Sequence, residues 1–256
     1  MCYDSNARPP DLPVPHGNAH GEDLVLTAAD GNRFAAYYAH PEQETIAQVL
    51  IYPDVRGLFK FYKELALRFA QVGVRALAID YFGRTAGLTP RDDSFEYMPH
   101  VQQLQFPTIM NDAQAALNYL HSLSSTPYAT FTLGFCMGGS ISLLTGTQNF
   151  DLTGIIGFYS GLSRKFAGGE GTTLEEARKI HYPVLDLFGG ADQGIPPEQV
   201  QALKNQLEAA GVEHDIVVYP GAPHSFFDRK ATEYADASAD AWRRVLGFIT
   251  AHSVKV

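Results

Sequence analysis

The segment Thr132–Ser140 places a thiol where it can act as a nucleophile. Its letters are Thr-Leu-Gly-Phe-Cys-Met-Gly-Gly-Ser, which fit G-x-C-x-G, the nucleophile-elbow pattern with cysteine in place of serine. An apolar run precedes Cys136 and a helical pattern starts at Ile141, so we expect the thiol at a sharp strand-to-helix turn. Gly134 and Gly138 remove the Cβ atoms that so tight a turn excludes. Unpaired N–H groups at the start of a helix favour the thiolate.

A cysteine nucleophile needs a base that takes its proton and a carboxylate that orients the base. Asp192 lies in a glycine-rich turn after one apolar strand pattern, and His224 lies in the loop after the next. Open α/β sheets place their chemistry beyond such strand ends, and the chain order nucleophile, acid, histidine is that of α/β-hydrolases. Asp186 is the rival acid, but its position inside a strand favours a packing role. These residues together predict a triad of Cys136, His224 and Asp192.

Three segments resemble those of the dienelactone hydrolase family: the elbow at 134–139, the turn at 188–196 and the loop at 220–226. The resemblance covers roughly residues 22–250. It implies an α/β-hydrolase fold and a Cys-His-Asp triad.

A nucleophilic attack also requires preorganised N–H donors for the oxyanion. The backbone N–H of Met137 is expected to be one of them, because this residue follows the nucleophile. The resemblance implies that Val55 supplies the other. Asp54 stands where known family members carry a glutamate that holds the resting thiol and helps to deprotonate it. Asp54 is one methylene shorter, and a loop-capping role is the alternative.

The resemblance also implies substrate contacts. Arg84 lies in the long segment 81–106, which is either a wall of the substrate pocket or an ordinary surface excursion. A family arginine after this strand contacts the substrate carboxylate, and Arg84 is similarly placed. A second family arginine follows the histidine by four residues, but this chain has Asp228 there, with Arg229 next as the expected substitute. Tyr159 resembles a family pocket tyrosine, with support of the core as the alternative.

Length and composition favour one soluble α/β domain over all 256 residues, with residues 1–22 as an irregular extension. The net charge of −9 argues against nucleic acid and anionic membranes as partners. No apolar run approaches the ~18 residues of a membrane span, and the polar start shows no secretory signal. We therefore expect a cytoplasmic protein, a monomer or small homo-oligomer. Its two cysteines, Cys2 and Cys136, are too few for a disulfide framework and should both be reduced.

Alternating strand and helix patterns predict a mostly parallel sheet of about eight strands with helices on both faces, the α/β-hydrolase arrangement. A hairpin signal at 30–32 opens the pattern, and Thr173 with Glu176 predicts a capping box on a short extra helix. The expected strands are 24–28, 34–39, 48–52, 75–79, 129–133, 153–158, 184–188 and 216–219, and the expected main helices are 59–72, 107–123, 141–147, 197–210 and 233–252.

The chemistry of a thiolate limits the substrate class. With a pKa near ~8.5, a thiol leaves a tetrahedral intermediate more readily than an alkoxide or amine does. Enol lactones, aryl esters and thioesters, whose own leaving groups are good, are therefore the expected substrates, and no cofactor is needed. A general carboxylesterase or thioesterase of the same fold is the runner-up.

Three other classes are weighed against hydrolysis. A ligand binder that has lost turnover conflicts with the intact trio of Cys136, Asp192 and His224. A thiol redox sensor needs a resolving cysteine, which only Cys2 could provide. Metal catalysis has little support, because His16 and His20 lie in a tail rich in proline and glycine.

Overall fold

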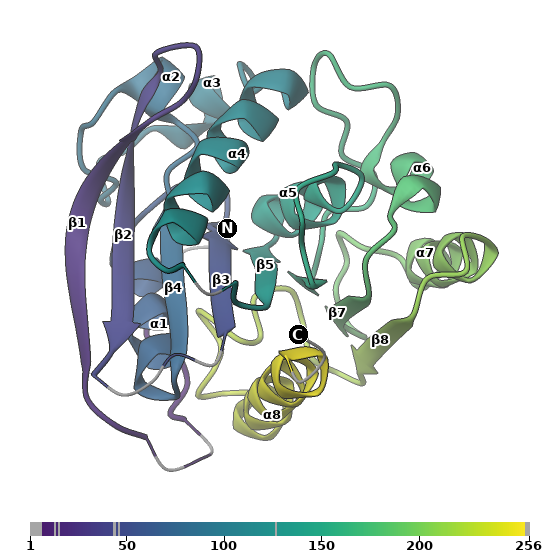
Figure 1. The fold of residues 1–256 in the computed structure, drawn as a ribbon. Coiled ribbons are helices and arrows are strands. Elements are labelled where there is room, and N and C mark those ends of the chain that lie inside the picture. Colours follow the sequence, from purple (N-terminus) through teal and green to yellow (C-terminus); the bar gives the residue numbers. More distant parts are fainter. Residues whose placement is uncertain are drawn as a thin grey trace.

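The computed structural model describes residues 7–253, except 13, 15, 43, 44, 46 and 126. Eight strands form one sheet in the order β1-β2-β4-β3-β5-β6-β7-β8 (Figure 1). β1 pairs antiparallel with β2 and β2 antiparallel with β4, and every other neighbouring pair is parallel. The predicted mostly parallel sheet is confirmed. The strands are β1 (Ala19–Thr27), β2 (Arg33–Pro41), β3 (Ala47–Tyr52), β4 (Val74–Ile79), β5 (Thr130–Phe135), β6 (Gly154–Phe158), β7 (Val184–Gly189) and β8 (His214–Tyr219).

Helices cover both faces of this sheet. On β5, the side chain of Phe131 packs against Phe248 of α8 with ring centroids 6.0 Å apart. The next residue, Thr132, hydrogen-bonds Ser142 of α5 at 2.9 Å. Successive strand residues point to opposite faces, so α8 and α5 lie on opposite sides. The helices are α1 (Lys60–Gln71), α2 (Gly83–Ala86), α3 (Tyr97–Val101), α4 (Phe106–Ser122), α5 (Met137–Thr145), α6 (Thr173–Glu176), α7 (Pro197–Ala209) and α8 (Ala235–Ser253).

Strand β1 starts earlier than the sequence indicated. It begins at Ala19, inside the stretch 1–22 that was expected to be irregular, and pairs with β2 from Ala19 opposite Pro41. Most of its side chains are exposed, because it is an edge strand. Backbone pairing rather than buried alternation holds it, so no hydrophobic period marks its start. The expected place of Cys2 lies outside the described residues.

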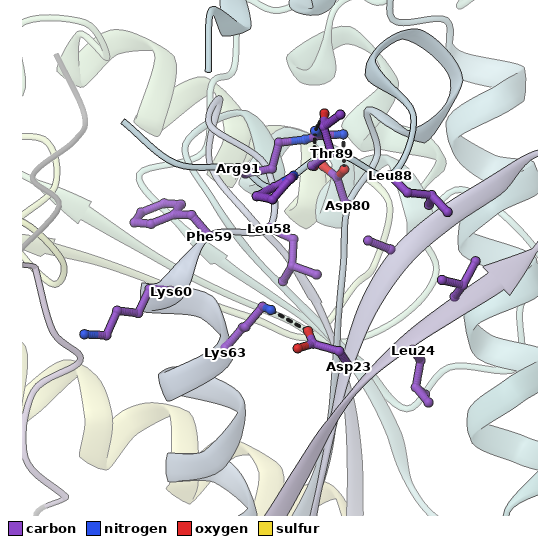
Figure 2. Close-up of a pocket in the computed structure, with 13 residues that line it drawn as sticks. Asp23, Leu24, Leu58, Phe59, Lys60, Lys63, Asp80, Leu88, Thr89 and Arg91 are labelled. Atoms are coloured by element: carbon purple, nitrogen blue, oxygen red, sulfur yellow. Dashed lines mark hydrogen bonds and ion pairs between the residues drawn. The ribbon is translucent and has the colours of Figure 1, made fainter. Parts of the chain in front are cut away.

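The segment between β4 and α4 is ordered by a buried ion pair. Arg91 Nη2 lies 2.6 Å from Asp80 Oδ2, and both side chains are almost fully buried. Arg91 also donates to the Gly87 carbonyl at 2.8 Å, so one side chain links two parts of the segment to Asp80 at the end of β4. Figure 2 shows this pair above an apolar hollow of about 520 Å³ between Leu58 and Leu88. None of the three predicted triad residues lines that hollow.

The short helix α6 has the predicted kind of start, one residue earlier than expected. Thr172 is its N-cap and accepts from the Glu175 N–H, while the Glu175 carboxylate accepts from the Thr172 N–H. The predicted pair Thr173 and Glu176 is therefore wrong by one position. Thr173 instead turns inward, and its N–H and hydroxyl both donate to the Arg164 carbonyl. The pairs Thr172 with Glu175 and Thr173 with Glu176 have the same spacing in the sequence. Only the packing of the folded chain decides which pair forms the capping box.

Candidate active site

The predicted elbow has the geometry that its glycines suggested. Cys136 lies between β5 and α5 with φ 56° and ψ −113°, a conformation that side chains with a Cβ rarely adopt. A Cβ on Gly134 would overlap the Gly138 carbonyl, and a Cβ on Gly138 would overlap the Pro53 carbonyl. The Cys136 N–H donates to the Phe158 carbonyl at 3.0 Å. The surrounding backbone therefore holds the strained residue in place.

The elbow also sets up the first predicted oxyanion donor. Cys136 is the N-cap of α5 and Met137 is its first residue, so the Met137 N–H is one of the helix's unpaired terminal groups. The Cys136 carbonyl accepts from Ser140 and from Gly161, each at 3.2 Å. The thiol thus lies at the positive end of a helix dipole, which favours its charged form.

His224 and Asp192 come from the loops after β8 and β7 and meet directly. His224 Nδ1 lies 2.6 Å from Asp192 Oδ2. A carboxylate only accepts hydrogen bonds, so Nδ1 carries the proton and Nε2 is left as the basic nitrogen. The other Asp192 oxygen accepts from the Gly194 N–H at 2.8 Å. The acid is fixed at both oxygens, and the imidazole is oriented by it. Both residues border a hollow of about 480 Å³ that Arg229 also lines.

Tyr159 connects the histidine with the elbow. Its ring centroid lies 4.7 Å from that of His224 and 6.1 Å from that of Phe135, the residue before the nucleophile. Its hydroxyl donates to Asp228 Oδ2 at 2.7 Å. Tyr159 is fully buried, and burial, followed by the charge of Asp228, raises its pKa well above the ordinary value. The ring packs beside the base, so the core-support alternative fits this position well.

The loop after β3 carries Asp54 and the predicted oxyanion donor Val55. Asp54 is 1% exposed, and its N–H donates to the Tyr62 hydroxyl at 2.9 Å. The Tyr81 hydroxyl donates to the carbonyls of Pro53, at 2.9 Å, and Asp54. Two buried phenols therefore pin the backbone on either side of Asp54. The Asp54 carboxylate also accepts from the Arg56 N–H at 2.8 Å, the contact expected of a loop cap.

The charges that act on Tyr81 show which groups share this neighbourhood. Burial raises the pKa of Tyr81 well above its ordinary value, and the charges of Asp54, Asp80 and Cys136 raise it further. The charge of Arg164 acts in the opposite direction and lowers the pKa. Asp54, Cys136 and Arg164 therefore all act electrostatically on one buried phenol, which hydrogen-bonds the loop after β3. Sequence reasoning missed Arg164, although its place in the loop after β6 was a signal.

Backbone contacts tie Arg164 to the elbow. Its N–H donates to the Gly161 carbonyl at 3.3 Å, and the Gly161 N–H donates to the Cys136 carbonyl at 3.2 Å. Its guanidinium lies over the Phe166 ring, 5.8 Å from the centroid. Within the described part of the chain, no carboxylate forms an ion pair with it. Among the residues that the structure describes, Arg164 is thus a cation near the elbow that no acid compensates.

Comparison with known proteins identifies the family of this chain. The model of the dienelactone hydrolase family matches residues 34–253. The chain belongs to this family. A protein from Yersinia pestis named "Putative carboxymethylenebutenolidase" is 26% identical over 249 residues, 93% of this chain and 91% of its own length. A protein of the same name from Methylorubrum extorquens is 28% identical over 229 residues, 86% of this chain and 77% of its own length.

Solved structures agree on the fold. The crystal structure of a putative dienelactone hydrolase from Klebsiella pneumoniae superposes on this chain with a TM-score of 0.80 at 22% sequence identity. The match covers 91% of this chain and 99% of that one. A dienelactone hydrolase-like promiscuous phosphotriesterase from metagenomic libraries superposes with a TM-score of 0.76 at 24% sequence identity, over 92% of this chain and 99% of that one. The chain therefore has the α/β fold of the dienelactone hydrolases, as the sequence predicted.

Arg84 has partners of its own in this family member. Its guanidinium lies 2.6 Å from Asp30 and 2.7 Å from Asp112, a buried residue of α4. The hydrogen bonds from Arg84 lower the pKa of Asp30 to about 2, whereas burial raises that of Asp112. The fork thus joins the β1–β2 turn to α4. Its predicted contact with a substrate carboxylate stays a prediction, and it would require release of one of these acids.

The other predicted substrate residue, Arg229, does lie at the site. It lines the hollow that Asp192 and His224 border, and its N–H donates to the Asp228 carboxylate. Its role toward substrate stays a prediction.

Across the described residues, no group of three or more His, Cys, Asp or Glu side chains could hold a metal ion. His20 of the predicted tail pair lies 2.9 Å from Glu42. In the same part of the chain, no helix is both long enough and apolar enough to cross a membrane.

Proposed function

We propose that this protein is a hydrolase that cleaves activated carboxylic esters or enol lactones through a cysteine acyl-enzyme. The observation that carries the proposal is the 2.6 Å contact between His224 and Asp192, packed through Tyr159 against the elbow that presents Cys136. A base oriented by an acid beside a thiol at a helix N-terminus is the arrangement that nucleophilic catalysis requires.

In the acylation half, His224 or Asp54 takes the proton of the Cys136 thiol, and the sulfur attacks the substrate's carbonyl carbon. A C–S bond forms while the carbonyl π electrons move onto oxygen. The N–H groups of Met137 and Val55 donate to this oxyanion. When the intermediate collapses, the C–O bond to the leaving group breaks. His224, which holds the thiol proton either directly or after transfer from Asp54, gives it to the departing enolate or aryloxide, and a thioester remains on Cys136.

In the deacylation half, His224 takes a proton from water and the resulting hydroxide attacks the thioester carbon. The C–S bond breaks, the carboxylic acid product leaves, and the His224 imidazolium gives its proton to the departing thiolate, which restores the Cys136 thiol. Asp192 keeps the Nδ1 proton in place and stabilises the imidazolium that forms twice in the cycle. Because the thiolate is itself a good leaving group, only substrates with equally good leaving groups advance. This favours enol lactones, aryl esters and thioesters.

One observation favours the runner-up, a general carboxylesterase or thioesterase. Asp228, a buried acid, stands where known family members carry a cation, and its carboxylate faces Tyr159. A dianionic lactone would meet this negative charge, whereas a neutral aryl ester or thioester would not. The names of the relatives from Yersinia pestis and Methylorubrum extorquens support the lactone class.

The test is a turnover screen with p-nitrophenyl acetate, an acyl thioester and an enol lactone, on the wild type and on Cys136→Ala. We expect hydrolysis of at least one substrate by the wild type and none above background by the variant. Mass spectrometry of acid-quenched enzyme should find the acyl group on Cys136. Cys2→Ser is the control and should keep the wild-type rate. A wild type that binds these compounds without turnover, or a Cys136→Ala variant that still hydrolyses them, would contradict the proposal.

A further inference from the structure

A buried carboxyl that the proposed mechanism does not use lies inside β7. Asp186 is 0% exposed, and one of its oxygens accepts from the Leu187 N–H at 3.0 Å. The chain's described residues supply no cation within ion-pair distance of it. Burial raises the pKa of Asp186 to about 7. An acid in the middle of a fully buried strand is costly, so it calls for a structural reason.

The side chain beside this carboxyl is Ser160. Ser160 Oγ and Asp186 Oδ2 are both buried, and neither has a hydrogen-bond partner among the described residues. Ser160 nevertheless lies near enough to lower the pKa of Asp186 against the effect of burial, so each of these two unsatisfied groups is the natural partner of the other. Both polar groups occupy the space left by Gly157 on β6, where a Cβ would lie 2.5 Å from Asp186 Oδ1. A Cβ on Gly139 of α5 would lie 2.5 Å from Ser160 Oγ. The pair is therefore packed against Gly157 of β6 and Gly139 of α5, the helix that starts at the nucleophile elbow.

Ser160 is the central residue of a turn that contacts both ends of the triad. The Tyr159 N–H donates to the Leu187 carbonyl at 2.8 Å, next to Asp186 on β7. Tyr159 has φ 39°, a strained value, and places its ring against His224. On the other side of Ser160, the Gly161 N–H donates to the Cys136 carbonyl at 3.2 Å. A shift of this turn would therefore move the support of the base and of the nucleophile together.

We propose that Asp186 and Ser160 form a positioning pair, in which an uncharged carboxyl hydrogen-bonded to the hydroxyl holds the turn 159–161 against Cys136 and His224. The inference rests on the proposed hydrolase function, because the triad is what the turn positions. Asp186 acts through Ser160 and does not touch substrate.

The surroundings make the pair sensitive to pH. The groups that face Asp186 are Gly157 on β6, Ser160 in the connection after β6, and its strand partner Ile216 on β8. None of them is titratable, and no charged side chain contributes to the pKa of Asp186. When the carboxyl ionises, its charge is uncompensated in a closed apolar space. We expect the turn to loosen, so that turnover falls on the alkaline side for a reason separate from titration of the triad.

The test compares the wild type with Asp186→Asn, which keeps the shape and cannot ionise, over pH 5.5–9.5 in the Cys2→Ser background. Hydrolysis of p-nitrophenyl acetate gives kcat and KM at each pH. The ratio of kcat between variant and wild type should rise by up to about a hundredfold between pH 6 and 9, because the protonated fraction of the wild-type carboxyl falls about tenfold per unit above its pKa of about 7. KM should change little. Asp215→Asn, an exposed acid on β8, is the matched control and should leave the ratio flat.

A second readout does not depend on turnover. Above pH 7, the rate of Cys136 alkylation by iodoacetamide should depart from a single thiol titration curve in the wild type but not in Asp186→Asn. The near-UV circular dichroism of the tyrosines should change over the same pH range in the wild type only. Ser160→Ala removes the other member of the pair and should lower kcat at every pH. This variant replaces Asp186→Asn in the test if Asp186→Asn does not fold. Superimposable pH profiles for wild type and Asp186→Asn in kcat and in alkylation would overturn the inference. Absence of any turnover in the wild type, with the alkylation difference present, would overturn the proposed function alone.

Discussion

Tyr159 joins an acid and a base that are four residues apart in the chain: its hydroxyl donates to Asp228 at 2.7 Å while its ring lies 4.7 Å from that of His224. The buried carboxylate holds the phenol, and the phenol supports the imidazole. The contact explains how an acid is accommodated at position 228 in this family member.

Tyr159→Phe separates these two roles. It removes the hydroxyl, leaves the buried Asp228 carboxylate without this donor, and keeps the ring beside His224. We expect a loss of about 1–3 kcal/mol in the free energy of unfolding and a much smaller change in kcat. Urea denaturation and ester hydrolysis measure the two effects. Tyr159→Phe in an Asp228→Asn background should cost less, and an equal cost there would contradict the role of the hydrogen bond.

Removal of the base or its orienting acid should be severe. His224→Ala and Asp192→Asn are each expected to lower kcat by about a thousandfold or more, because the base or its correct tautomer is lost. Combination of either with Cys136→Ala should add little, since the three residues act as one unit. Steady-state kinetics with an aryl ester measures this. Losses that multiply in the double variants would assign Asp192 or His224 a purely structural role.

The two arginines Arg84 and Arg164 should respond differently to replacement by glutamine. Arg84→Gln leaves the buried Asp112 without its ion-pair partner, so it should lower the free energy of unfolding by roughly 1–3 kcal/mol and affect neutral and anionic esters alike. Arg164→Gln removes a cation that has no paired acid, so stability should change little. Its kcat/KM for an anionic aryl ester, such as a succinate monoester, should fall about tenfold more than for the acetate.

Lys165→Gln is the charge-matched control for this comparison, because Lys165 is exposed and its amine contacts the Glu170 carbonyl. Equal losses on both esters in Arg164→Gln would exclude it from charge recognition. Loss confined to the anionic ester in Arg84→Gln would restore the original prediction for that residue.

Asp186 should also make stability depend on pH. Its folded pKa of about 7 lies above the ordinary value of 3.8, so the folded state binds the extra proton between these values. The contribution of Asp186 to the free energy of unfolding is greatest below pH 4 and declines as the pH rises from 4 to 7. Above pH 7 the free energy of unfolding no longer varies with pH through this group. The total loss is roughly 4 kcal/mol, three pKa units at about 1.4 kcal/mol each. Asp186→Asn should raise the melting temperature at pH 8 relative to wild type and not at pH 4. A difference independent of pH would contradict this.

The parts of the site that follow strand ends could be predicted from the sequence. Cys136, Asp192 and His224 each follow a strand of the parallel sheet, and the carboxyl ends of such strands share one edge. Gly134 and Gly138 also indicated a tight turn at Cys136, because a glycine two residues before and another two residues after the nucleophile fit a backbone too crowded for Cβ atoms.

Contacts between distant segments could not be predicted in the same way. Arg84 meets Asp112 of α4 because of how α4 packs on the sheet, and no local pattern records that distance. Strand β1 is held by backbone pairing at an exposed edge, which leaves no hydrophobic signal at Ala19. The importance of Ser160 and Asp186 depends on a space that two glycines create on other elements.

The contact of Gly138 with the Pro53 carbonyl has a consequence for engineering. Main-chain atoms of two segments, more than eighty residues apart, crowd together there, next in sequence to the predicted oxyanion donors Met137 and Val55. Under the proposed mechanism, the space around the reacting oxygen is therefore set by backbone packing and not by the choice of side-chain rotamer. Mutant libraries aimed at new substrates should leave Gly134 and Gly138 untouched. The positions to vary are in the flanking loops, where Arg164 and Arg229 can be substituted while the backbone of the elbow keeps its conformation.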